Sequence, residues 1–161
     1  MGYAEALTAE EDWFTSPLVG VPPLIKEDGG PFDVCAAQVR RLSQAPRQLF
    51  LGHTRSTDGR QSKTPDHRID HEIVALVFWS AIGAGARAHR DQAELDAAVE
   101  RVLARIRGLQ GDSTHGGRWW GVGEARVEPP NPATLLAFSD AAGAVGAAYQ
   151  VSVRYTVVEY L

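Results

Sequence analysis

The stretch IDHEIVALVFWS, residues 69–80, is the strongest strand signal in the sequence. Alternate residues from Ile69 to Trp79 share one face and most of them are apolar, which predicts one buried face of a β-strand. Val74, Leu76 and Phe78 lie on the opposite face, so we expect the second half of the strand to be buried on both sides. The strand is therefore predicted to be central in a sheet.

The clearest helix follows this strand, over residues 91–107. Its apolar residues recur at helical spacing; they are Leu95, Val99, Val102, Leu103 and Ile106. Asp91 is a suitable N-cap, and Gly108 or Gly111 can end the helix. Burial of each apolar side chain is worth about 1.5–3 kcal/mol, so the helix is expected to pack on the sheet.

Further strands are predicted on both sides of this unit. Leu49, Phe50 and Leu51 form a compact apolar run in residues 47–55. Short strands are expected in RWWGVGEARVEP (residues 118–129) and TLLAFSD (134–140), and a last strand in AAYQVSVRYTVVEYL (147–161). In the last strand, apolar and polar residues alternate from Tyr149 to Val157, which is typical of an antiparallel strand with one solvated or subunit-facing side.

The N-terminal part carries weaker signals. Thr8 followed by Glu11 resembles a capping box and predicts a short helix that Pro17 limits, within an otherwise irregular segment over residues 1–32. Asp33 is a suitable cap for a second short helix, with Val34, Cys35 or Ala37, Val39 and Leu42 on its apolar face and Pro46 at its end. Residues 52–68 are polar and lack periodicity, so they are predicted to form a long polar loop, mobile or drawn out as an extended hairpin.

The order of these elements predicts a single α+β domain over residues 1–161. It combines a mostly antiparallel or mixed sheet with the long helix over residues 91–107 and a shorter N-terminal helix. A chain of 161 residues with 44% hydrophobic residues is long enough for one such core, and neither a repeat nor a linker divides it.

Composition excludes several classes of protein. The single cysteine, Cys35, cannot form an internal disulfide or a cysteine-based zinc site, and a reducing cytoplasm is expected. The acidic N-terminus does not resemble a signal peptide, and no apolar stretch reaches the roughly 20 residues that span a bilayer, so we expect a soluble protein. A net charge of −4 gives no overall reason to bind nucleic acid or anionic lipid.

A metal site is the main catalytic alternative. In DHRIDHE, residues 66–72, His67, Asp70 and His71 are residue types that bind Zn²⁺ or Mn²⁺. On a strand, however, residues four apart lie about 13 Å from each other, so one ion cannot bridge both histidines. A small metal-dependent hydrolase or nuclease using these residues, with His89 as a further candidate ligand, is the alternative from a different class. The other histidines, His53 and His115, are isolated in polar stretches.

Other motifs do not indicate catalysis. Cys35 is expected to be a buried structural thiol, and the glycine-rich stretches lack the spacing of phosphate-binding loops. Six residues remain as candidates for an interface: Arg55, Arg60, Lys63, Arg68, Trp119 and Trp120. The arginines and the lysine make a modest positive patch. The two adjacent tryptophans point to opposite faces on a strand, so one can enter the core and the other can anchor a contact.

Three runs together resemble a known family. HEIVALVFWSAIGAGARAHRDQAELDAAVERVLA (residues 71–104), GRWWGVGEARVEPP (117–130) and AAYQVSVRYTVVEY (147–160) are similar to the tail terminators of long-tailed bacteriophages, the minor tail protein U-like or tail-completion proteins. The pattern covers roughly residues 49–161, and residues 18–32 depart from it.

The resemblance implies a virion structural protein that is not an enzyme and needs no cofactor or metal. It implies a homohexamer that caps the tail tube, stops its polymerisation and offers a surface to the head–tail connector or stopper protein. The implied partners are further copies of the chain, the tail tube protein and the connector, with DNA passing through the lumen without specific binding and no membrane partner. The implied location is the virion neck, after assembly in the host cytoplasm. Another neck component and an unrelated monomeric binding module are the remaining alternatives.

Overall fold

The computed structural model describes residues 2–37, 47–60, 67–80, 86–108, 113–128, 136–139 and 145–160. Two α-helices, one short 3-10 helix and seven strands follow one another in these ranges. In chain order they are α1 (Tyr3–Thr15), η1 (Lys26–Asp28), β1 (Val34–Ala37), β2 (Arg47–Arg60), β3 (His67–Ser80), α2 (Ala86–Arg107), β4 (Gly121–Val122), β5 (Arg126–Glu128), β6 (Leu136–Ser139) and β7 (Val145–Tyr160).

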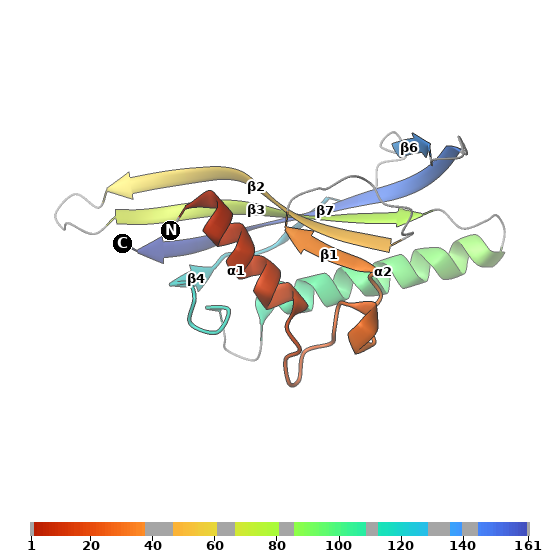
Figure 1. The fold of residues 1–161 in the computed structure, drawn as a ribbon, viewed down its shortest axis with the longest axis horizontal. Helices are drawn as coiled ribbons and strands as arrows, with labels where there is room; N and C mark the ends of the chain where they lie inside the picture. Colours follow the sequence, from red (N-terminus) through yellow and green to blue (C-terminus); the bar gives the residue numbers. More distant parts are fainter. Residues whose placement is uncertain are drawn as a thin grey trace.

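All the described strands belong to one mixed sheet (Figure 1). Its order begins β1-β2-β3-β7, and β4, β5 and β6 each pair with a different part of β7. Only β1 and β2 are parallel, whereas the other pairs are antiparallel. The predicted α+β class with a mostly antiparallel sheet is confirmed, and the strand around residues 69–80 is central as predicted.

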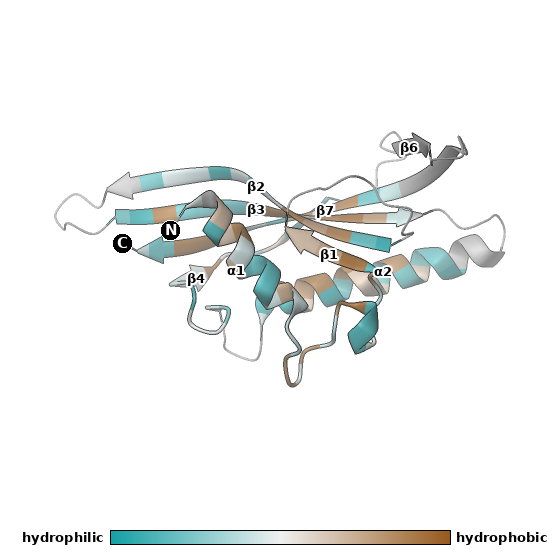
Figure 2. Ribbon diagram, viewed as in Figure 1, coloured by the Kyte–Doolittle hydropathy of each residue, from teal (hydrophilic) through white to brown (hydrophobic). Residues whose placement is uncertain are grey.

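Both helices pack on one face of the sheet. The buried stripes of α1 and α2 join a single apolar cluster with alternate residues of β3 and β7, including Val77, Trp79, Val153 and Tyr155. Figure 2 shows apolar segments of the central strands beside apolar segments of α2. None of the described helices has the length and apolar character needed to cross a membrane.

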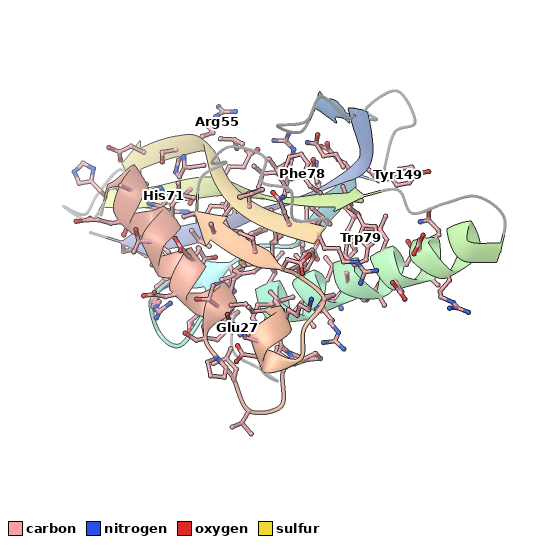
Figure 3. The ribbon with its side chains drawn as sticks, turned by 45° about the vertical axis from the view of Figure 1, so that its right-hand side comes forward. Glu27, Arg55, His71, Phe78, Trp79 and Tyr149 are labelled. Atoms are coloured by element: carbon pink, nitrogen blue, oxygen red, sulfur yellow. The ribbon has the colours of Figure 1, made fainter. Side chains whose placement is uncertain are left out.

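The other face of β3 is also buried in its second half, as the sequence predicted. Phe78 is 7% exposed and packs edge-to-face against Phe50 of β2, with ring centroids 5.7 Å apart. Phe78 and its neighbour Trp79 lie on opposite faces of the sheet (Figure 3). Trp79 lies beneath the Arg47 guanidinium, 4.2 Å from the ring centroid, and Arg47 is paired with Glu94 of α2.

The N-terminal expectation needs correction. The predicted short N-terminal helix is present as α1 (Tyr3–Thr15), but it begins before the predicted Thr8 cap. Gly2 is the N-cap, and its backbone N–H donates to Glu5 at 2.9 Å. The Thr8 hydroxyl instead donates to the carbonyl of Ala4 inside the helix, which a threonine does when it is not a cap.

The predicted helix after Asp33 is wrong for the part that the structure describes. Residues 34–37 form β1, and the remainder of that prediction, with Val39, Leu42 and Pro46, lies outside the described residues. Asp33 does not cap a helix. Its backbone N–H donates to the carbonyl of Arg47 at 2.9 Å, and its carboxylate accepts from the Arg47 N–H at 3.2 Å. These two bonds align the following residues with β2.

The predicted loop over residues 52–68 is largely a strand pair. β2 continues to Arg60 and β3 begins at His67, so the extended-hairpin alternative is correct and only residues 61–66 lie outside the described part. Polar pairs such as Thr57 opposite Asp70 satisfy the backbone ladder without an apolar signal.

The helix over residues 91–107 was predicted too short. It begins at Ala86, so Asp91 is inside α2 and is not its cap. Gly108 ends it as predicted, with φ +74° and a bond from its N–H to the carbonyl of Ala104.

Candidate functional site

The candidate site lies in the half of the sheet that ends at the β2–β3 turn. We call this part the distal sheet; it comprises residues 53–60 of β2, 67–73 of β3 and 155–160 of β7. Its strands reach past α1 (Figure 1). One face of the distal sheet is on the side of α1, and the other face carries neither α1 nor α2.

A β-bulge in β2 decides which side chains turn towards the α1 side. The pairing register between β2 and β3 shifts between His53 and Arg55. On a regular strand, His53 and Ser56 would point to opposite faces, because they are three residues apart. The extra residue of the bulge brings both side chains to His71 of β3, which faces the core.

Four polar residues meet at this bulge, and we call them the histidine cluster: His53, Ser56, His71 and Glu159. His53 Nε2 lies 3.1 Å from His71 Nδ1. Ser56 Oγ lies 3.1 Å from His53 Nε2 and 2.8 Å from His71 Nδ1. On its other side, His71 Nε2 is 2.8 Å from Oε1 of Glu159. His71 and Glu159 are only 2% and 7% exposed.

The Glu159 carboxylate selects one tautomer of a neutral His71. It accepts a hydrogen bond from Nε2–H of His71, so the Nδ1 of a neutral His71 presents its lone pair to Ser56 and His53. Burial, together with the neighbouring His71, lowers the pKa of His53, which favours a neutral imidazole there too. The Ser56 hydroxyl contacts both imidazoles, unlike the nucleophile of a catalytic triad, which has a single base.

A second buried network surrounds Glu10 of α1, which is fully buried. Its carboxylate lies 2.8 Å from His115 Nδ1 and accepts from Trp119 Nε1 at 3.2 Å and from the Tyr155 hydroxyl at 2.7 Å. His115 Nε2 donates to the carbonyl of Ile106 at 2.7 Å. Burial first, and then the Glu10 charge, raise the pKa of Tyr155. The network joins α1, the end of α2, the segment before β4 and β7, so its role is structural.

Three predicted interface residues do gather on the helix-free side of the distal sheet. Trp120 is 67% exposed and stands edge-to-face on Tyr160, with ring centroids 5.0 Å apart. Tyr160 is paired across the strands with Arg68, whose guanidinium donates to Asp70 at 2.8 Å. Arg55 is exposed on the side of β2 away from α1 (Figure 3). We call Arg55, Arg68, Trp120 and Tyr160 the distal patch.

Of the other three predicted interface residues, only the side chain of Trp119 is described. Trp119 is 3% exposed and belongs to the Glu10 network, so the tryptophan pair divides between core and surface as predicted. Arg60 ends β2 opposite His67, but its side chain lies outside the described residues. Lys63 also lies outside the described residues.

The DHRIDHE motif does not converge on one point. His67 faces Asp58 at 3.3 Å, Asp70 pairs with Arg68, and His71 turns into the core towards Glu159. In the described part of the chain, no group of three or more His, Cys, Asp or Glu residues is placed to hold a metal ion. The side chain of His89 lies outside that part.

Sequence reasoning missed His53, Ser56 and Glu159 as partners of His71. His53 is not isolated in a loop; it lies on β2 beside His71. One signal was present: His71 shares its strand face with Ile73, Ala75 and Val77, and a histidine on a buried face needs polar partners. No feature of the sequence predicts the bulge that supplies these partners.

An apolar groove lies between α2 and the β5–β7 pair. It has a volume of about 450 Å³, and its lining residues are Asp96, Ala97, Val99, Glu100, Leu103, Val127 and Val151. Val127 is 40% exposed in the groove. Asp96 and Glu100 make its α2 rim acidic. We call it the α2 groove.

No protein-family model matches the chain, and no curated protein matches it at a significant level.

Proposed function

We propose that this protein is a tail terminator of a long-tailed bacteriophage, a structural protein that forms a homohexameric ring on the tail tube. The resemblance of residues 71–104, 117–130 and 147–160 to that family supports the proposal. The observation that carries it is the presence of two unlike exposed surfaces on one domain, the distal patch and the α2 groove.

Two unlike surfaces are what a ring requires. In a closed ring each subunit offers one surface to the next subunit and a different one to the previous subunit. The distal patch has an exposed Trp120, and tryptophan is a frequent anchor of interfaces. The α2 groove offers an apolar floor around Val127 and Leu103 that can receive such an anchor.

The charges of the two surfaces are complementary. Arg55 has no ionic partner among the described residues, and neither has Glu100 on the groove rim. Docking the distal patch of one subunit in the α2 groove of the next brings a free cation to a free anion, which favours the correct register. The ring closes when six such contacts return to the first subunit.

The remaining surfaces of the ring would contact the tail tube protein on one side and the head–tail connector or stopper on the other. The net charge of −4 suits a ring through which DNA passes, because each phosphate held by a cation adds affinity and slows passage.

The first test is the mass of the assembly. Native mass spectrometry and negative-stain imaging of the purified protein, alone and with tail tubes from the same source, should show a ring of six at tube ends. Trp120→Ser should abolish the ring, whereas Val19→Ser should not, because Val19 is 93% exposed outside both surfaces. A protein that stays monomeric and leaves tube ends bare contradicts the proposal. A ring that does not bind tail tubes but binds the connector would identify the protein as another neck component.

A further inference from the structure

The histidine cluster brings two imidazole nitrogens and a hydroxyl oxygen together at one point. His71 Nδ1 has a single lone pair in the ring plane, yet Ser56 Oγ approaches it to 2.8 Å and His53 Nε2 to 3.1 Å. Three atoms that can each present a lone pair therefore meet within 3.1 Å of one another. A cation at the same point would accept a lone pair from each of the three atoms.

The spacing of these atoms fits a small metal ion. The triangle formed by His53 Nε2, His71 Nδ1 and Ser56 Oγ has sides of 3.1, 3.1 and 2.8 Å. A point about 2.1 Å from all three corners exists just outside its plane, and about 2.0–2.1 Å is the usual distance from Zn²⁺ to an imidazole nitrogen.

The surroundings of His71 resemble those of a metal ligand. An imidazole that binds a metal commonly donates its second N–H to a carboxylate, which fixes the tautomer and orients the ring. Glu159 Oε1 is in this position, 2.8 Å from His71 Nε2, and both side chains are buried. The bulge at residues 53–55 supplies the second imidazole, and bulges are frequent where a strand must redirect a side chain.

We propose that His53, His71 and Ser56 bind one divalent transition-metal ion of the Zn²⁺ class, with Glu159 orienting His71. Two neutral imidazoles and a hydroxyl select Zn²⁺, Ni²⁺ or Cu²⁺ over Mg²⁺ or Ca²⁺, which prefer carboxylate and carbonyl oxygens. His53 and Ser56 are partly exposed, so an ion can enter and water can complete its shell. With only two strong ligands, the affinity should be micromolar rather than that of a closed structural zinc site. The ion would clamp β2 to β3 at the bulge.

Calorimetric titration of the untagged, chelator-treated protein with Zn²⁺ tests this proposal, and Co²⁺ absorption reports the ligand geometry. The wild type should bind one equivalent of Zn²⁺ and no Mg²⁺. His53→Gln should weaken binding at least tenfold, because it removes an imidazole from a partly exposed position and leaves His71 and Glu159 in place. The matched control is His67→Gln, an exposed histidine of the same hairpin, which should bind like the wild type.

Ser56→Ala provides an independent check, with a smaller loss of affinity because a hydroxyl is the weakest of the three ligands. Circular dichroism of each variant establishes that it is folded. The proposal is overturned if the wild type binds no Zn²⁺ at millimolar concentration or if His53→Gln binds as tightly as the wild type. It is also overturned if binding is lost in His67→Gln instead, since the ion would then belong to the DHRIDHE stretch.

Discussion

Glu10 is a fully buried residue whose carboxylate contacts three other side chains. Replacing it by Ala leaves the His115 Nδ1, the Trp119 Nε1–H and the Tyr155 hydroxyl without an acceptor in the core. Breaking a buried ionic network by removing one member costs about 3–5 kcal/mol. We therefore expect Glu10→Ala to lower the free energy of unfolding by that amount in urea denaturation.

The control for this prediction is Glu27→Ala. Glu27 is exposed on η1 (Figure 3), and a surface change of this kind should stay within about 0.5 kcal/mol of the wild type. Equal stabilities of the two variants would show that the Glu10 carboxylate is not engaged as described.

Cys35 gives a pH-dependent prediction. Burial, with a smaller effect of the Glu11 charge, raises the pKa of its thiol to about 12 from an ordinary value of 9.0. Between these two values the unfolded chain loses the thiol proton while the folded chain keeps it, so stability should fall as the pH rises above 9.0. Below pH 8 the thiol contributes no pH dependence.

The reactivity of Cys35 checks the same shift. Since the thiolate is the nucleophile, Ellman's reagent at pH 8 should react with the folded protein at least about tenfold more slowly than with the urea-unfolded chain. Cys35 is the only cysteine, so the signal is unambiguous. Equal rates in the two states would refute the raised pKa.

Single residues also show how far the candidate site could be predicted. The sequence predicted that Trp119 and Trp120 divide between core and surface, without naming which residue goes where, although the structure places both just before β4 and not on it. The partners of His71 did not follow, because Glu159 is 88 residues away and Ser56 reaches the correct face only through a bulge. Contacts between distant strands depend on register, which composition does not encode.

At the scale of elements, the turn between Leu24 and Phe32 depends on Gly30. A Cβ on Gly30 would lie 2.2 Å from the carbonyl carbon of Leu24 and 2.6 Å from the backbone nitrogen of Ile25. Backbone atoms cannot move aside as a flexible side chain does, so Gly30→Ala must open the turn. Because Leu24 and Phe32 are both core residues, we expect a loss of about 3 kcal/mol in thermal or urea unfolding.

The matched substitution is Gly121→Ala. A Cβ on Gly121 meets no atom within 4 Å, and its φ is not positive, so this variant should keep wild-type stability. If Gly30→Ala were equally stable, the close approach of the two chain segments in this turn would be incorrect.

Elements whose apolar residues recur at a regular spacing could be predicted from the sequence. Elements that are positioned by specific polar hydrogen bonds could not. The positions of β3, β7 and α2 followed from alternation or helical spacing because burial of their apolar faces stabilises them directly. β1 did not follow, since Asp33 was interpreted as a helix cap although it bonds the Arg47 backbone. The polar half of β2 was predicted only as one of two alternatives, a mobile loop or an extended hairpin, because its residues pair across strands without an apolar face.

At the scale of the whole molecule, the two proposed docking surfaces arise from segments that are distant in sequence. The distal patch takes residues from β2, β3, β7 and the segment before β4, and the α2 groove joins a helix to two strands. The sequence predicted three of the four patch residues, Arg55, Arg68 and Trp120, from charge and aromatic content. It did not predict the groove, whose floor residue Val127 was expected only as part of a strand.

A mixing experiment decides whether these surfaces join head to tail. Trp120→Ser damages the distal patch and leaves the α2 groove intact, whereas Val127→Glu adds a charge to the apolar groove and leaves the patch intact. Each variant alone should be monomeric. An equimolar mixture should form a one-to-one dimer and no larger assembly. The intact patch of Val127→Glu docks in the intact groove of Trp120→Ser, and the two surfaces that remain exposed are the substituted ones. Native mass spectrometry distinguishes the mixed dimer from monomers by mass. If the mixture contains only monomers while the wild type forms rings, the ring uses other surfaces.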